Sequence, residues 1–156
     1  MVEDFQKKEK QLDMYGIQYW PRQNSVIAAT RFKGKSIFGV SSDDAPEPVY
    51  TAEDWDRAIK MRANLIRKYP ATMAVDNIGE MPNDSVFHSE STLLMRAADK
   101  NGGNLQGETL EVYVNERLCP SCKIVLPLLG KELGNPTVIF FDKFGGTYTM
   151  RNGQLE

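Results

Sequence analysis

The residues best suited to chemistry stand in two short motifs. The only histidine of the 156-residue chain, His88, opens the run His-Ser-Glu and lies two residues before Glu90. The only two cysteines, Cys119 and Cys122, enclose Pro and Ser in the run Cys-Pro-Ser-Cys. Two thiolates and one imidazole form a good ligand set for Zn²⁺. Three protein ligands also leave the fourth tetrahedral position open for water, which is the arrangement of catalytic zinc sites.

The elements around the motifs are expected to bring them together. A helix is predicted from about His88 to Lys100, where Asn-Gly-Gly closes it. A strand is predicted over 109–115, followed by a helix that begins at Pro120 and that Pro127 should kink or divide. Because a single strand links the two helices, both helix N-termini should emerge at the same edge of the sheet. A helix N-terminus favours negative charge, by about 0.3–1 kcal/mol in exposed settings, which helps to keep the cysteines as thiolates.

The rest of the chain predicts an α/β fold. The other expected elements are a charged helix over 3–14, a hairpin over 25–32 and 36–41, a helix over about 52–69 that a Thr51–Asp54 capping box opens, and a closing hairpin over 137–142 and 147–152. The helical period predicts that the 52–69 helix has one apolar side, made of Trp55, Ala58, Ile59, Leu65, Ile66 and Tyr69. We therefore expect a single domain over 1–156 with an inserted helical segment at about 43–84. Its sheet should be mixed and five-stranded, with helices on both faces and the final two strands antiparallel.

The charges are segregated along a chain whose net charge is −2. Residues 17–42 contain no Asp or Glu but include Arg22, Arg31, Lys33 and Lys35, and such a run can give a nearly neutral protein a local positive surface. No window approaches the roughly 18 apolar residues of a membrane span. The first residues are charged and predict no signal peptide. We expect no membrane insertion by this domain.

The two motifs resemble those of the cytidine deaminase-like superfamily, and the chain is most similar to the deaminase domains of secreted bacterial toxins that act on cytosine in single-stranded DNA. The similar stretch runs from about Ser25 to Asn152, and its most specific parts are HSESTLLMRAADKNGG, the serine pair at 41–42 and LCPSC. The resemblance implies the three-layer fold of that superfamily and one zinc ion, held by His88, Cys119 and Cys122. It makes Glu90 the acid and base of a hydrolytic deamination of cytosine to uracil. One departure is Leu118, which stands where many members have proline.

The resemblance also implies a biological setting. Toxins of this kind are C-terminal domains of longer secreted effectors, which act in the cytoplasm of a target cell in competition between bacteria and cause mutagenesis there. A cognate immunity protein is then an expected partner, beside the single-stranded DNA substrate. RNA, or free cytidine and its nucleotides in a metabolic role, is the alternative substrate.

Several residues are predicted to contact the substrate. A deaminase acts on an unpaired base, and single strands suit a surface with cations and aromatic stacking groups. Such contacts are predicted for residues of the basic segment, of the second strand's end and of the two motif flanks: Tyr19, Trp20, Arg31, Ser41, Ser42, Phe87 and Arg117. Tyr19 and Trp20 should stack on a base, and Arg31 should contact phosphate. Burial of Trp20 in the core is the alternative for that residue.

Other interpretations of the motifs fit less well. A thioredoxin-like redox pair is disfavoured because the expected order of elements is absent. A structural zinc site normally has four protein ligands, and the chain offers three of the usual kind. A serine hydrolase lacks a nucleophile elbow. A non-catalytic, zinc-stabilised binding module would have no use for an unligated Glu90.

Overall fold

A six-stranded mixed sheet is the frame of the molecule. The computed structural model describes residues 26–42, 50–73, 84–118 and 120–156. The strands are β1 (Ile27–Phe32), β2 (Lys35–Val40), β3 (Thr109–Val114), β4 (Thr137–Asp142), β5 (Thr147–Arg151) and β6 (Gln154–Leu155). They lie in the order β2-β1-β3-β4-β5-β6, with β3 and β4 parallel and every other neighbouring pair antiparallel. Both expected hairpins are confirmed, including the antiparallel pair β4 and β5.

The prediction of five strands was wrong. After β5 the chain turns through Asn152 and Gly153, whose φ angles are 53° and 76°, and returns as the short strand β6. Asn-Gly is the residue pair that favours such a tight hairpin turn, because both residues tolerate positive φ. Lys33 and Gly34 make the equivalent turn between β1 and β2, with φ of 50° and 79°.

Three long helices accompany the sheet in the described ranges. They are α2 (Ala52–Lys68), α4 (Ser89–Lys100) and α5 (Pro120–Glu132), with the short helices α3 (Pro70–Met73) and η1 (Asp84–Phe87) between the first two. The capping box that was expected to open α2 is present between Thr51 and Asp54. Pro127 does not divide α5, which runs continuously through it. None of the helices in the described ranges is both long and apolar enough to span a membrane.

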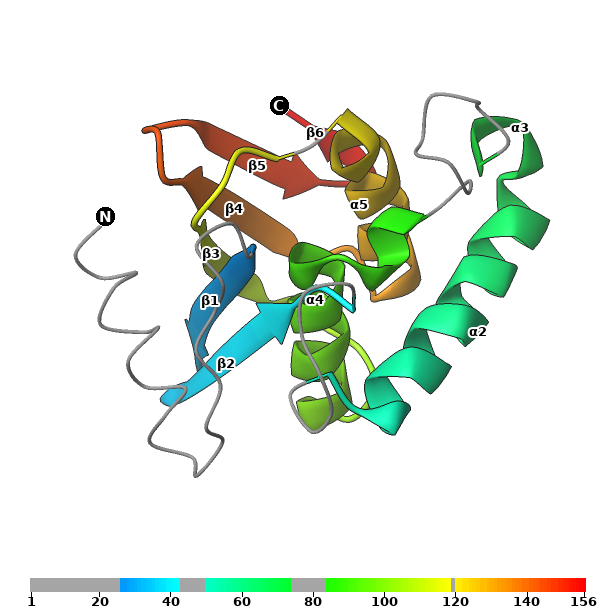
Figure 1. The fold of residues 1–156 in the computed structure, drawn as a ribbon, viewed down its shortest axis with the longest axis horizontal. Helices are drawn as coiled ribbons and strands as arrows, with labels where there is room; N and C mark the ends of the chain where they lie inside the picture. Colours follow the sequence, from blue (N-terminus) through cyan, green and yellow to red (C-terminus); the bar gives the residue numbers. More distant parts are fainter. Residues whose placement is uncertain (1–25, 43–49, 74–83, 119) are drawn as a thin grey trace.

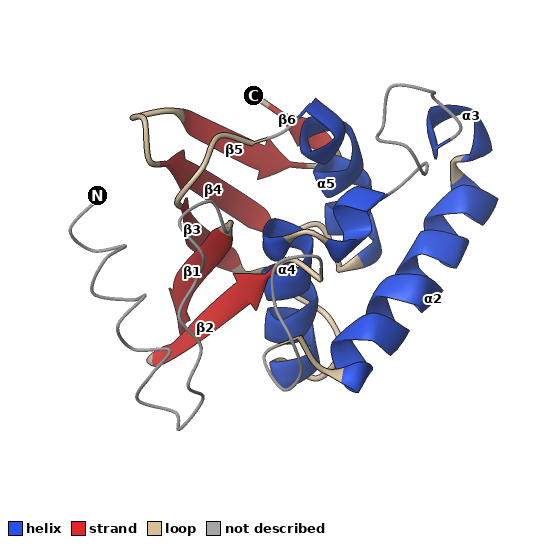
Figure 2. Ribbon diagram, viewed as in Figure 1, coloured by secondary structure: helices blue, strands red, loops and turns tan. Residues whose placement is uncertain are grey.

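All the described helices lie on one side of the sheet (Figures 1 and 2). Helix α4 packs against β1 and β2, and α5 packs against β5 and β6. The approach of α4 is so close that a Cβ atom on Gly39 would lie 2.0 Å from the carbonyl oxygen of Ser89 and 2.7 Å from the Cβ of Leu93. The prediction placed helices on both faces of the sheet, and the described residues show helices on one face. The expected helix over 3–14 falls outside the described residues.

Helix α2 forms an outer layer on α4, η1 and α5. Its buried side consists of Asp54, Ala58 and Leu65. Only part of the predicted apolar side is buried, because Trp55, Ile59 and Ile66 are 47%, 37% and 44% exposed. These three residues lie on a neighbouring strip of the helix surface, about 100° around the axis from the buried strip.

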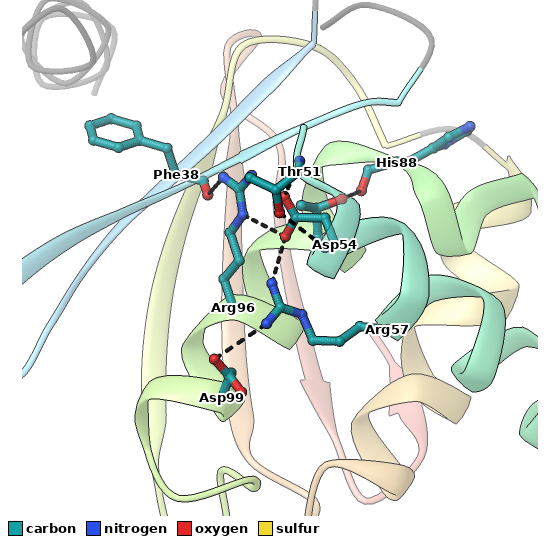
Figure 3. A network of polar contacts seen from close by, with 8 residues as sticks. Phe38, Thr51, Asp54, Arg57, His88, Arg96 and Asp99 are labelled. Carbon is teal, nitrogen blue, oxygen red and sulfur yellow. Dashed lines mark hydrogen bonds and ion pairs between the residues drawn. The ribbon is translucent and has the colours of Figure 1, made fainter. Parts of the chain in front are cut away.

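Buried ion pairs explain why α2 is turned in this way. Asp54, only 3% exposed, accepts hydrogen bonds from Arg96 of α4 and from Arg57, the second at 2.7 Å (Figure 3). Arg96 also donates to the carbonyl oxygen of Phe38 in β2 at 2.9 Å. Burial acts to raise the pKa of Asp54, but the hydrogen bonds and positive charge of Arg96 outweigh it and hold that pKa well below its usual range. The carboxylate thus remains charged and joins α2, α4 and the sheet.

Candidate metal and catalytic site

The first turns of α4 and α5 bring three chemical groups together. His88 is the N-cap residue of α4, Glu90 lies in its first turn, and Cys122 is the third residue of α5. The Nδ1 atom of His88 lies 3.3 Å from the Sγ atom of Cys122. The Cys122 thiol also donates a hydrogen bond to Oε2 of Glu90, at 3.4 Å. The predicted meeting of the His-Ser-Glu motif with the second cysteine is therefore present in the fold.

This group of side chains can hold a metal ion. One ligand atom from each of His88, Glu90 and Cys122 lies within 4.8 Å of the others. A thiolate and an imidazole suit zinc and other borderline transition metals, and the carboxylate adds negative charge. Cys119, the remaining predicted ligand, lies outside the described residues.

The carboxylate of Glu90 is enclosed and oriented. Its residue is 3% exposed, and Cys122 is 2% exposed. The hydroxyl of Ser89 donates to Oε1 of Glu90 at 2.7 Å, while the thiol occupies the other oxygen. Burial and the bond from Ser89 restrict the direction of this carboxylate in a way that does not depend on the protonation of Cys122, and general acid and base chemistry needs such positioning.

The backbone of His88 is held by α4 itself. Its carbonyl oxygen accepts the Thr92 amide at 2.9 Å and the Thr92 hydroxyl at 2.8 Å. Its amide donates to the carbonyl oxygen of Ser85 at 3.1 Å. The extended backbone of His88, with φ of −78° and ψ of 167°, is the ordinary conformation of an N-cap residue. The imidazole is thus directed by the helix start and not by a flexible loop.

Three serines join the elements that carry the site. The hydroxyl of Ser85 in η1 donates to that of Ser121 in α5 at 2.5 Å. The hydroxyl of Ser91 in α4 donates to the carbonyl oxygen of Ser85 at 2.7 Å. Both Ser85 and Ser91 are buried. Hydrogen bonds therefore connect η1 to the first turn of both site helices.

Some of the predicted substrate contacts lie beside this group. Phe87 directly precedes His88, and its carbonyl oxygen accepts the amide of Ser42 at 3.1 Å. The end of β2 with Ser41 and Ser42 therefore borders the segment that carries His88, although Ser41 is buried. Arg117 lies in the segment between β3 and α5, and its guanidinium stacks over the ring of Phe144 at 4.7 Å.

Arg31, another predicted contact, is not brought to the site. Arg31 pairs with Ser36 near the β1–β2 turn. The neighbouring Lys33 donates to Asn101 at 2.6 Å, at the far end of α4 from His88. A 12-residue helix is about 18 Å long, so Arg31 lies far from the metal-binding group. Tyr19 and Trp20 fall outside the described residues.

Sequence reasoning missed several residues around the site. Ser85 and Ser121 are separated by 36 positions, and no periodic pattern indicates their contact. Trp55 was predicted only as part of the apolar side of α2, and no pattern indicated that its exposed ring packs on Phe87 with centroids 5.0 Å apart. The exposed ring of Phe144, in the turn after β4, had one signal in the sequence, since an aromatic residue is unusual between Lys143 and Gly145 in a tight turn.

A separate hollow lies away from this group. It has a volume of about 330 Å³ and lies between α2 and the C-terminal half of α4, where Met61, Met95, Ala98 and Leu133 supply its apolar lining. None of the side chains of the metal-binding group lines it.

Comparison with known proteins gave no match, either among protein-family models or among curated protein sequences. What the geometry of the described residues supports directly is a histidine, a glutamate and a cysteine grouped closely enough to hold a metal ion.

Proposed function

We propose that the chain is a zinc-dependent deaminase that converts cytosine to uracil in single-stranded DNA, as the toxin domain of a secreted bacterial effector. The observation that carries the proposal is the grouping of His88, Glu90 and Cys122 at the start of two helices. Imidazole and thiolate ligands fit zinc, and Cys119 precedes Cys122 by three positions as the remaining ligand. Three such ligands leave Glu90 available for proton transfer.

The reaction needs a nucleophile and a proton carrier. Zinc held by His88, Cys119 and Cys122 would supply a Lewis acid that makes water nucleophilic near neutral pH. The water oxygen bonds to C4 of cytosine, the C4–N bond breaks, and ammonia leaves. Glu90 accepts a proton from the water, delivers it to N3 of the ring, and transfers the second proton to the departing amine, as in other zinc base deaminases. The bond from Ser89 to Oε1 supports this role because it directs the second oxygen, Oε2, toward Cys122.

The substrate class follows from the resemblance and from the access that the chemistry requires. C4 of a paired cytosine is unreachable inside a duplex, so the base must be unpaired or extruded. The sequence motifs are most similar to those of toxins that act on single strands of DNA. Such a toxin is paired with an immunity protein that covers its active site.

A deamination assay tests the proposal. Zinc-loaded protein is incubated with cytosine-containing single-stranded DNA, the matching duplex, single-stranded RNA of the same sequence and free cytidine, with Glu90→Ala as the control. We expect uracil in single-stranded DNA only, and none with Glu90→Ala.

Other outcomes would redirect the proposal. Turnover of RNA alone, or of free cytidine alone, would replace the substrate and the toxin role while keeping the chemistry. Zinc-loaded protein without turnover of any of the four would contradict a cytosine deaminase and favour a binding module.

A further inference from the structure

An exposed tryptophan, Trp55, packs on the ring of Phe87, the residue directly before His88. Phe87 is almost fully buried, and the indole of Trp55 packs on it with ring centroids 5.0 Å apart and planes inclined by 37°. Trp55 itself is 47% exposed. The aromatic surface of Trp55 therefore faces solvent while its ring packs on Phe87, the residue next to the predicted metal ligand His88.

Packing holds this tryptophan in place. The ring of Tyr50 meets Trp55 edge to face, with centroids 6.5 Å apart and planes at 81°. The guanidinium of Arg62 lies 5.1 Å from the centroid of Phe87. The indole is thus in contact with two other rings. Arg62 provides a cation about two helical turns further along α2. An aromatic ring that is fixed and exposed can stack with a nucleobase at little entropic cost, since its rotamer is already set.

Trp55 is flanked by the acidic residues Glu53, Asp54 and Asp56, but the charge of α2 beyond it suits a polyanion. From Arg57 to Lys68 the helix has five basic residues and no Asp or Glu, although the whole chain has a net charge of −2. Arg57 and Lys68 pair with carboxylates, whereas Lys60, Arg62 and Arg67 form no ion pair with another described residue. Aromatic stacking surfaces combined with backbone-tracking cations are the usual means of binding single strands.

We propose that Trp55 and Arg62 form a stacking subsite for a nucleotide that neighbours the target cytosine in a single strand. The neighbouring base stacks on the exposed indole, and the guanidinium pairs with the adjoining phosphate. This inference rests on the proposed function for the identity of the target base. It adds that α2 binds the strand, so that the preferred substrate is a polynucleotide and not a free nucleoside.

Strand binding is measured first, because it does not depend on turnover. Glu90→Ala protein is titrated against a fluorescein-labelled single-stranded oligodeoxycytidine and followed by anisotropy. Adding Trp55→Ala should weaken binding about tenfold, within the range of one lost base–aromatic stack. Trp55→Phe should retain most of the affinity. Arg62→Ala should weaken binding and reduce its dependence on salt, which provides a second variant if Trp55→Ala is poorly folded.

Ile66→Ala is the matched control, because Ile66 is 44% exposed on the same strip of α2. The proposal predicts unchanged oligonucleotide affinity for it. Unchanged affinity in Trp55→Ala and Arg62→Ala would overturn the subsite. Equal loss in Ile66→Ala and Trp55→Ala would also overturn it, since the loss would then come from a general disturbance of α2 and not from a base stacked on the indole.

Turnover separates this inference from the proposed function. In protein that keeps Glu90, Trp55→Ala should raise the KM for the oligonucleotide about tenfold and leave kcat unchanged. Ile66→Ala should leave both the KM and the kcat for the oligonucleotide unchanged, because Ile66 lies on the same strip of α2 but outside the subsite. Trp55-dependent strand binding without any deamination would support the subsite and contradict the deaminase, whereas deamination that is insensitive to Trp55 would support the deaminase and contradict the subsite.

Discussion

At the scale of single residues, the carboxylate of Glu90 is bonded on both oxygens inside the protein. Ser89 donates to Oε1 at 2.7 Å and the Cys122 thiol donates to Oε2 at 3.4 Å. Ser89 is fully buried, so water does not readily replace its hydroxyl. The role of this serine is to position the carboxylate and not to react.

Ser89→Ala should lower kcat about tenfold without changing the zinc content. Loss of one hydrogen bond to a charged group removes roughly 1.5–3 kcal/mol, and only part of that affects the transition state. The measurement is deamination of a single-stranded oligonucleotide, with zinc per chain determined on the same samples.

Ser91→Ala is the control for this prediction. It removes a hydroxyl from the same turn of α4, but that hydroxyl bonds to the carbonyl oxygen of Ser85 and not to Glu90. An equal loss of turnover in both variants would indicate a general loosening of the helix start and contradict a specific role for Ser89.

The residues of the candidate site were predictable to the extent that local spacing determines their position. His88 and Glu90 are two residues apart at a helix start, and one crossover strand separates them from Cys122, so their meeting follows from the order of elements. The bond between Ser85 and Ser121 is different, because it joins residues 36 positions apart through tertiary packing alone. Arg31 shows the same limit, because the antiparallel pairing of β1 with β3 carries it away from the edge of the sheet where β3 leads into α5.

At the scale of elements, the docking of α2 depends on Asp54. Its carboxylate joins Arg57 and Thr51 of its own helix region to Arg96 of α4. Asp54→Asn should lower the free energy of unfolding by about 2 kcal/mol, below the 3–5 kcal/mol of a fully buried pair, because it leaves the partly buried charge of Arg96 poorly compensated. Urea denaturation at neutral pH measures this change, with Asp56→Asn, an exposed carboxylate on the same helix, as the control.

The same ion pair predicts a pH dependence with a defined sign. The pKa of Asp54 is lower in the folded protein than its usual value, which is about 3.9 in unfolded chains. The stabilisation is therefore complete above about pH 5 and is lost progressively as the pH falls below 4 toward the folded pKa. The difference in stability between wild type and Asp54→Asn should shrink over that range. A difference that stays constant down to pH 2 would show that the charge on Asp54 does not stabilise the fold.

Two elements show why helical and strand patterns give an incomplete prediction. The span of α2 followed from its capping box and from Pro70, but its orientation did not, because the buried Asp54 and Arg96 pair overrides the apolar period. The strand β6 has only two residues, too few for an alternation pattern, although Asn152 and Gly153 before it are a recognisable turn pair. Local signals thus specify where elements begin and end more reliably than which side they bury.

At the scale of the whole molecule, the metal-binding group lies where α4 and α5 meet, and both helices pack on the same face of the sheet. A ligand that binds only the folded state stabilises it in proportion to its affinity and concentration. Removal of zinc with a chelator should therefore lower Tm by about 10 °C, since roughly 4 kcal/mol is lost at a thousandfold excess over Kd and each kcal/mol corresponds to about 2–4 °C in a domain of this size. Thermal unfolding with and without chelator measures the shift, and re-addition of zinc should reverse it.

Cys122→Ser provides the comparison for the chelation experiment. If the metal site is the source of the stabilisation, this variant should have a lower Tm that the chelator does not change further. A chelator effect of the same size in wild type and Cys122→Ser would assign the stabilising ion to another place in the molecule.

Zinc per chain, measured by mass spectrometry of the purified protein, tests the central claim most directly. Glu90 lies within reach of the same ion as His88 and Cys122, so the distinction between ligand and proton carrier rests on which substitution removes the metal. We predict one zinc per chain in wild type and in Glu90→Gln, and almost none in His88→Ala or Cys122→Ser. Loss of zinc from Glu90→Gln would make Glu90 a ligand, and zinc-free wild-type protein that does not take up added zinc would contradict a zinc enzyme altogether.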